Sequence, residues 1–175
     1  MKAVLDACVL YPTITRGLLL DAAAAGVFTP LWSERILAEW THAAAKDTPQ
    51  ALVEAERVML VAKWPDALVT VKPETGVDLS LPDPNDTHVL AAALDGGAAM
   101  VVTFNLKDFP SRTLGRHGVS AAHPDAFLLS AVEEQPDLRG AFANRLAPLM
   151  DQGKTMRDIL KRARLPRLGK ALAQA

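Results

Sequence analysis

The amino-acid sequence predicts an α/β protein in which a parallel β-sheet carries helices on its faces and is followed by a C-terminal helical extension. Short apolar, β-prone runs alternate with longer helical stretches over most of the chain. After Pro124 the pattern is helical only. Because the chain has 175 residues and half of them are hydrophobic, we expect one well-buried domain with a smaller helical tail.

Apolar runs predict the strands, which are expected at residues 2–6, 27–32, 67–72, 99–104 and 119–122. Start and stop signals predict the helices between them. Gly26 and the Gly96–Gly97 pair end two helices, Ser33 can cap a third, and Thr48–Pro49 can begin a fourth. The expected helices are 14–25, 33–46, 49–63 and 86–96, followed by helices that start at Pro124, at Pro136 and at a capping box over Thr155–Asp158.

Composition excludes several classes of protein. Cys8 is the single cysteine, so the chain cannot form an internal disulfide, and a reducing cytoplasm is the expected location. The first residues carry an aspartate inside a short apolar run and do not resemble a signal peptide. No apolar stretch is long enough to cross a membrane, so we expect no membrane association.

Charge is divided unevenly although the net charge is only −1. Residues 154–175 contain seven basic residues and one acidic residue, which leaves 12 basic and 19 acidic residues before them. The basic residues of this tail are candidates for phosphate contacts with a nucleic acid, chiefly Lys154, Arg157, Lys161, Arg162 and Arg164. The alternative is an ordinary solvated helix face, and the sequence leaves both open.

Two acidic residues stand out in the first part of the chain. Asp6 closes the first predicted strand, where ligands of an open parallel sheet bind, and a carboxylate there needs a cation, a hydrogen-bond donor or solvent. Glu39 borders the apolar stripe of the 33–46 helix and could face a cleft. The ordinary alternatives are a helix-capping aspartate and a surface glutamate.

The segment before the fourth helix contains two more acids. Asp86 stands in the first turn of that helix, where the helix N-terminus favours a negative charge, so a capping role is a strong alternative to metal binding. Asp83 is fixed between Pro82 and Pro84 three residues earlier and is an accessory candidate.

A loop after the 99–104 strand offers Thr103, Asn105 and Asp108 at the same edge of the sheet. Each could serve turn formation alone. Together with acids at other strand ends, they indicate an oxygen-lined site for a hard cation such as Mg²⁺ or Mn²⁺. The four histidines have no metal-ligand spacing and are interpreted as structural or solvated, with His88 turned away from Asp86. Neither a nucleophile elbow nor a glycine-rich phosphate loop is present.

The order of these motifs resembles the PIN-domain family, which includes the VapC-type toxins of toxin–antitoxin pairs. The resemblance rests on Asp6 after the first strand, Glu39 on a helix, Asp86 before HVLAAA, and the TFNLKDF segment after a later strand, and it covers about residues 1–130. Residues 131–175 form the expected helical extension with its basic end.

The resemblance implies a three-layer, doubly wound parallel sheet and a metal-dependent endoribonuclease. Asp6, Glu39, Asp86 and Asp108 match the catalytic and metal-binding acids, with Asp83, Thr103 and Asn105 in support. Mg²⁺ or Mn²⁺, an RNA substrate, an antitoxin partner and a homodimer are the implied cofactor and partners. One departure is Cys8, where family members often have asparagine, which puts one supporting hydrogen bond in doubt.

Two alternative functions stay open. A haloacid-dehalogenase-type phosphatase also begins with an aspartate after its first strand, but it needs a second aspartate at the position of Cys8. A PIN-fold protein that binds RNA without cleaving it would have the same fold, although the presence of all four acids favours the enzyme.

Overall fold

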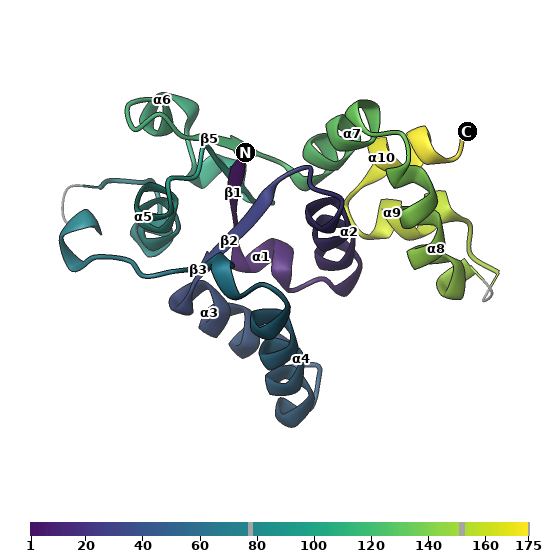
Figure 1. Ribbon diagram of the computed structural model, residues 1–175, viewed down its shortest axis with the longest axis horizontal. Helices are drawn as coiled ribbons and strands as arrows, with labels where there is room; N and C mark the ends of the chain where they lie inside the picture. The colour runs from purple at the N-terminus through teal and green to yellow at the C-terminus, as the bar shows by residue number, and fades with distance from the viewer. Residues whose placement is uncertain (77–78, 151–152, 175) are drawn as a thin grey trace. The chain divides into compact units, whose positions relative to one another are not determined.

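The α/β class and the parallel sheet are confirmed in the computed structural model, which describes residues 1–76, 79–150 and 153–174. Within these ranges, five strands form one sheet in the order β3-β2-β1-β4-β5, and every neighbouring pair is parallel. The strands are β1 (Lys2–Leu5), β2 (Thr29–Ser33), β3 (Leu68–Val69), β4 (Met100–Val102) and β5 (Ser120–Ala122) (Figure 1).

The strand order creates a switch point at the centre of the sheet. The chain moves outward from β1 to β2 and β3, and then returns to build β4 and β5 on the other side of β1. Adjacent strands β1 and β4 are therefore followed by connections that lead in opposite directions. In doubly wound sheets, ligands bind beyond the carboxyl ends of such strands.

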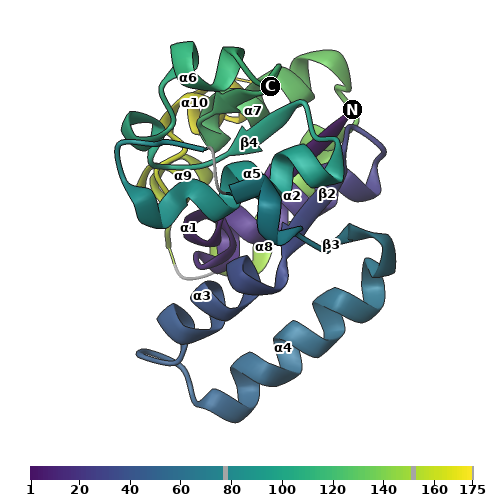
Figure 2. The ribbon, with the colours of Figure 1, turned by 90° about the vertical axis from the view of Figure 1, so that its left-hand side faces the viewer.

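Burial explains why β1 is a continuous apolar run. Ala3, Val4 and Leu5 are completely buried, which is typical of a central strand in a parallel sheet covered on both faces. Helix α5 (Thr87–Gly96) packs against β1, β2 and β4 (Figure 2). The close approach depends on Gly96, where an added Cβ would lie 2.7 Å from a methyl carbon of Leu31.

The helices of the sheet region begin and end near their predicted positions. Helix α3 (Glu34–Ala44) is capped by Ser33, whose Oγ accepts a hydrogen bond from the backbone N–H of Ile36 at 3.3 Å. Helix α4 (Gln50–Lys63) follows Pro49, and α5 ends at Gly97, which has the left-handed φ of 63° that favours glycine. Two short helices, α1 (Ala7–Leu10) and α6 (Ser111–Gly115), were not predicted.

The third strand is shorter than the predicted 67–72. Only Leu68 and Val69 pair with β2. The backbone N–H of Lys72 instead donates to Asp95 Oδ2 at 2.7 Å, so a side chain on α5 replaces the hydrogen bond that a longer strand would have made. Three 3₁₀ turns flank this short strand in the sequence. The turn η1 (Pro65–Ala67) precedes β3, and η2 (Pro73–Gly76) and η3 (Pro84–Asp86) follow it.

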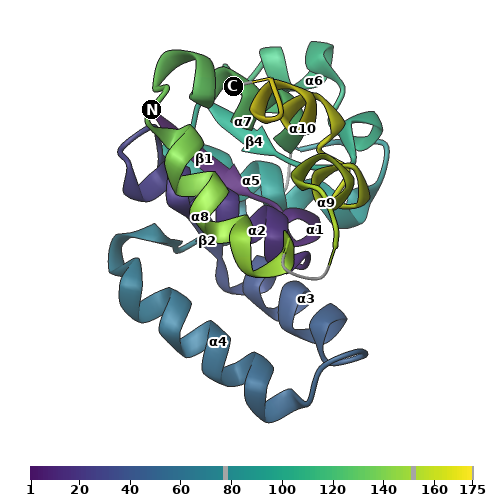
Figure 3. The same ribbon diagram turned by 90° about the vertical axis from the view of Figure 1, so that its right-hand side faces the viewer.

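Compactness divides the chain into two units. The first contains residues 1–11 and 28–122, with the whole sheet, and the second contains residues 12–27 and 123–175. The second unit consists of α2 (Thr13–Ala24), α7 (Pro124–Glu134), α8 (Leu138–Met150), α9 (Met156–Arg162) and α10 (Pro166–Leu172) (Figure 3). The predicted extension is therefore helical, whereas the family-domain boundary at residue 130 stays a prediction.

The second unit has its own core and its own fixed points. Phe142, Leu160 and Leu168 are completely buried. The buried carboxylate of Asp125 accepts hydrogen bonds from the backbone N–H groups of Arg167 and Leu168 at 3.0 and 2.9 Å, which attaches α10 to α7. No described helix is long and apolar enough to cross a membrane.

Candidate active site

Asp6 forms the centre of a polar cluster at the switch point. It follows β1 directly, and its backbone N–H donates to the carbonyl of Val102 on β4 at 3.1 Å. Its side chain is only 7% exposed. A carboxylate in this position is costly unless it is hydrogen-bonded or paired with a cation.

Thr103 and Cys8 supply the hydrogen bonds that Asp6 requires. The completely buried Thr103 donates from Oγ1 to Asp6 Oδ2 at 2.7 Å, and the Cys8 thiol donates to the same oxygen at 3.1 Å. Cys8 Sγ also accepts from the backbone N–H of Phe104 at 3.3 Å. Both side-chain donors reach Oδ2, so Oδ1 makes no side-chain hydrogen bond among the described residues.

The thiol therefore supplies a supporting hydrogen bond where the sequence put one in doubt. Burial, followed by the negative charge of Asp6, raises the pKa of Cys8 to about 12. The raised pKa favours the neutral thiol at physiological pH, which can donate a hydrogen bond to Asp6.

The loop after β4 is held by its own side chains. Thr103 Oγ1 accepts from the backbone N–H of Asn105 at 3.0 Å, and Asn105 Nδ2 donates to Asp108 Oδ2. Asp108 ends the 3₁₀ turn η4 (Leu106–Asp108). The residues predicted from this loop are thus linked to one another and, through Thr103, to Asp6.

Glu39 lies on α3 between two basic side chains. Arg35 Nε donates to Glu39 Oε1 at 3.2 Å, one helical turn earlier on the same helix. His88 Nε2 on α5 lies 2.9 Å from the same oxygen. Burial raises the pKa of Glu39, against the opposing effect of Arg35, and the negative charge of Asp6 raises it further.

His88 lies in the first of the two environments expected for the histidines, structural rather than solvated. Its side chain is 10% exposed and lies beside Glu39 rather than in solvent. Burial, together with the positive charge of Arg35, lowers the pKa of His88 to about 4, so the ring is neutral at pH 7. The contact with Glu39 therefore joins a neutral imidazole to a carboxylate.

Asp86 is the acid whose titration the site perturbs most clearly. It precedes α5, yet its side chain caps no backbone N–H, so the capping alternative is not supported. Burial raises its pKa to about 6, with further contributions, in decreasing order, from Asp6, Asp83, Asp108 and Glu39. Burial and nearby like charges both disfavour the ionised carboxylate.

Asp83 has a local structural role. Its Oδ1 accepts from the backbone N–H of Asn85 at 2.9 Å and caps the turn that leads into Asp86. The carbonyl of Asn85 in turn accepts from Arg35 Nη2 at 3.4 Å. Arg35 thus connects Glu39 with the loop that carries Asp86.

Carboxylate oxygens of this kind suit a hard divalent cation, and the raised pKa of Asp86 indicates negative charge that such a cation would offset. The side chains as they stand do not yet form a complete cage. Within residues 1–76, 79–150 and 153–174, no three Asp, Glu, His or Cys side chains meet closely enough to hold an ion. Glu39 and Asp108 are occupied instead by Arg35 and Asn105.

The five basic candidates for nucleic-acid binding all belong to the second unit and all have exposed side chains: Lys154, Arg157, Lys161, Arg162 and Arg164. Thr155 caps α9 by accepting from the backbone N–H of Asp158 at 3.1 Å, as the predicted capping box requires. The role of the five basic residues in binding RNA stays a prediction.

Comparison with known proteins decides the family. The model of the PIN domain matches residues 2–107, which is more than half of the chain and includes Asp6, Glu39, Asp86 and Thr103. The chain belongs to the PIN-domain family. Asp108 lies one residue beyond the matched part of this PIN domain.

One curated relative of this PIN-domain protein is “Putative ribonuclease VapC50” of Mycobacterium tuberculosis, 48% identical over 48 residues. The alignment covers 27% of this chain and 28% of that relative. The chain therefore matches little more than a quarter of the relative's length. No solved structure matches the chain.

Sequence reasoning missed Arg35, His88 and the donor role of Cys8. The i,i+4 spacing of Arg35 and Glu39 was a usable signal for their contact. No local signal connects His88 with Glu39, because the two residues meet only when α3 and α5 are folded onto the sheet.

Proposed function

We propose that this PIN-domain protein is an endoribonuclease that hydrolyses RNA phosphodiesters with Mg²⁺ or Mn²⁺ at the Asp6 site. One observation carries the proposal: the buried carboxylate of Asp6 is held by Thr103 and Cys8 at the end of β1, and burial of Asp86, followed by the charges of Asp6 and the other acids, raises the pKa of Asp86 to about 6. Like charges are seldom collected in a half-buried site unless a cation is to be bound there.

We assign Asp6 and Asp86 as the direct ligands. Asp6 Oδ2 is held by Thr103 and Cys8, which orients the carboxylate and leaves Oδ1 for a cation. Asp86 makes no side-chain hydrogen bond among the described residues, so it can turn toward an ion without breaking one. When bound, the divalent ion would lower the pKa of a water molecule and offset charge on the phosphate.

Glu39 and Asp108 are assigned to orient the attacking water or complete the ion's surroundings once RNA is present. Glu39 is held by Arg35 and lies near the neutral His88, so its position is set before substrate arrives. Asp108 is fixed by Asn105 in the same way. Positioning of groups before the reaction lowers the barrier because less reorganisation is needed.

The likeness to a VapC-named relative supports a further part of the proposal, that this nuclease is the toxin of a toxin–antitoxin pair. An antitoxin with a basic segment would complement the acidic cluster, which consists of Asp6, Glu39, Asp86 and Asp108. A small reading frame beside the gene, whose product co-purifies with the chain and suppresses cleavage, would support this role. A chain that no neighbouring product inhibits would instead be a stand-alone nuclease.

The decisive experiment compares Asp6→Asn with the wild type on a labelled RNA in Mn²⁺. Loss of a direct metal ligand should reduce cleavage by at least about a hundredfold, while circular dichroism stays unchanged. Asp66→Asn is the matched control, because Asp66 is exposed in η1, outside the acidic cluster. Equal cleavage by Asp6→Asn and the wild type would overturn the catalytic assignment, and cleavage by neither would favour a protein that binds RNA without cutting it.

A further inference from the structure

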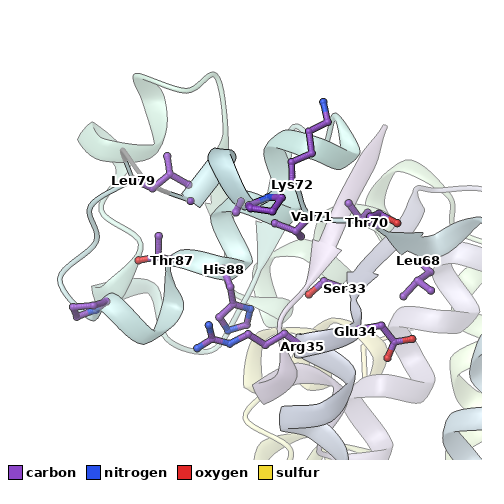
Figure 4. Close-up of a pocket in the computed structure, with 15 residues that line it drawn as sticks. Ser33, Glu34, Arg35, Leu68, Thr70, Val71, Lys72, Leu79, Thr87 and His88 are labelled. Atoms are coloured by element: carbon purple, nitrogen blue, oxygen red, sulfur yellow. The ribbon is translucent and has the colours of Figure 1, made fainter.

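A cleft beside the acidic cluster is not used by the proposed chemistry. It has a volume of about 700 Å³, within the roughly 300–1,000 Å³ typical of small-molecule sites. Its walls come from the start of α3, the segment after β3, and the first turns of α5. Figure 4 shows Val71 and Lys72 on one side of this β3–α5 cleft and Arg35 and His88 on the other.

The β3–α5 cleft is continuous with the acidic cluster through two side chains. Arg35 and His88 line the cleft, and both also contact Glu39, at 3.2 and 2.9 Å. A ligand that fills the cleft therefore lies next to the proposed catalytic acids. The cleft is placed to hold the part of a substrate that adjoins the reacting phosphate.

Charge in the β3–α5 cleft differs from that of the acidic cluster. Lys72 contributes an exposed positive charge at the wall, and the guanidinium of Arg35 also lines the cleft while it pairs with Glu39. The lining acid Glu34 is compensated, because Arg57 Nη2 lies 2.6 Å from its Oε2. The cleft thus suits a phosphate-bearing ligand, whereas the neighbouring acids repel one until a cation is bound.

The remaining lining suits a flat heterocycle with hydrogen-bonding edges. Val69, Val71, Leu79 and Ala91 provide apolar surface. The imidazole of His88 is nine-tenths buried on the wall, and its two enclosed ring nitrogens make no hydrogen bond among the described residues, although Nε2 lies 2.9 Å from Glu39 Oε1. The apolar walls suit the faces of a nucleobase.

The wall formed after β3 is fixed rather than loose. Asp95 on α5 accepts from the backbone N–H of Lys72 at 2.7 Å and from Thr75 Oγ1 at 2.9 Å. These two bonds hold the segment opposite Arg35 and His88. A cleft that is formed before binding loses less conformational entropy when the ligand enters.

We propose that the β3–α5 cleft binds one nucleotide of the RNA substrate, with the base between the apolar walls and the phosphate toward Arg35. This places the adjoining phosphodiester over Asp6 and Asp86. The cleft then selects which nucleotide stands next to the cleaved bond. Nucleotide binding is inferred from the cleft alone, whereas the role of the cleft in cleavage specificity rests on the proposed ribonuclease function.

The test measures binding separately from cleavage. The four ribonucleoside 5′-monophosphates are titrated into the full chain, without metal, up to about 10 mM, and amide shifts are followed by NMR. Shifts should concentrate at Val69–Lys72 and Thr87–Ala91. Val71→Trp, which fills the cleft, should weaken nucleotide binding by at least about tenfold, whereas Val58→Trp on the exposed face of α4 should not change it.

A kinetic measurement then connects the cleft to specificity. Val71→Trp should raise KM for RNA by a much larger factor than KM for bis(p-nitrophenyl) phosphate, which has no base to occupy the cleft. Thermal melts check that the variant folds. If it does not, Lys72→Glu takes its place with Lys46→Glu as the control, since both lysines are exposed and only Lys72 lines the cleft.

The outcomes separate the two proposals. Absence of shifts with all four nucleotides, nucleotide binding by Val71→Trp equal to the wild type, or a change in self-association alone would overturn the nucleotide cleft. Binding that the cleft variants remove, in a chain that cleaves no RNA, would uphold the cleft and refute the ribonuclease. Metal-dependent RNA cleavage by a chain that binds no nucleotide in the cleft would uphold the ribonuclease and refute the nucleotide cleft.

Discussion

Replacing Asp86 by asparagine should stabilise the metal-free protein at neutral pH. Its pKa is raised from 3.8 to about 6, so ionisation is easier in the unfolded chain than in the folded one. A raised carboxyl pKa means that the free energy of unfolding falls as pH rises from 3.8 toward 6 and stays low above that range. Asparagine cannot ionise and removes this loss.

The magnitude follows from the shift after a reduction for solvent. A full shift of this size corresponds to about 3 kcal/mol. Asp86 is only partly buried, so screening lowers the expected gain to about 1–2 kcal/mol at pH 8. At pH 5 the gain should be roughly half as large, because the folded carboxyl is then mostly protonated while the unfolded one is mostly ionised. No capping hydrogen bond is lost, since the Asp86 side chain makes none.

The assay is urea unfolding of wild type, Asp86→Asn and the control Asp66→Asn at pH 5 and pH 8, with chelator present. In separate unfolding curves without chelator, Mn²⁺ should stabilise the wild type by about 2.7 kcal/mol at a hundred times its Kd, and stabilise Asp86→Asn much less. A variant that is no more stable than the wild type at pH 8, or a gain of equal size at both pH values, would refute the electrostatic reasoning.

Two further predictions concern orientation and the basic tail. Thr103→Val removes the 2.7 Å hydrogen bond to Asp6 and should lower cleavage by about 10–100-fold, while Thr103→Ser should retain most activity; equal rates for the two variants would exclude an orienting role. Lys161→Gln with Arg162→Gln, both exposed, should lower the slope of log K against log salt for single-stranded RNA by about 1.4, measured by fluorescence anisotropy. An unchanged slope would make these side chains an ordinary solvated face.

Point substitutions are the suitable test of the tail because the structure argues against removing it. Ile159, Leu160, Leu165 and Leu168 are buried in the second unit, so deletion of residues 154–175 would expose apolar core. Weaker RNA binding after such a deletion could then result from unfolding alone. Substitution of the exposed Lys161 and Arg162 changes the charge of the tail without removing buried side chains.

Much of the fold could be predicted because its signals are local. The apolar run before Asp6, the Ser33 cap and the glycine stop at Gly97 each depend on a few neighbouring residues. The third strand was predicted too long because the β-branched residues Thr70 and Val71 have strand-like character. A hydrogen bond from the backbone N–H of Lys72 to the side chain of Asp95 on α5 takes the place of strand pairing there.

The candidate site was predictable to the extent that parallel strands align their carboxyl ends. That rule places Asp6 and Thr103 at the same edge of the sheet, and the pairing of β1 with β4 joins them at 2.7 Å. It does not specify which side chains complete the surroundings. The donor role of Cys8 and the contact of His88 with Glu39 depend on distances between elements that are separate in the sequence.

By itself the sequence determined the alternation of strands and helices, the family and the acids available for a metal, because these depend on residue type, periodicity and order along the chain. Only the tertiary structure decided the protonation of Asp86 and His88, the thiol donor at Asp6 and the cleft beside Arg35. Burial and Coulomb interactions arise between segments that folding brings together, so pKa values and cavities do not exist before the chain is folded.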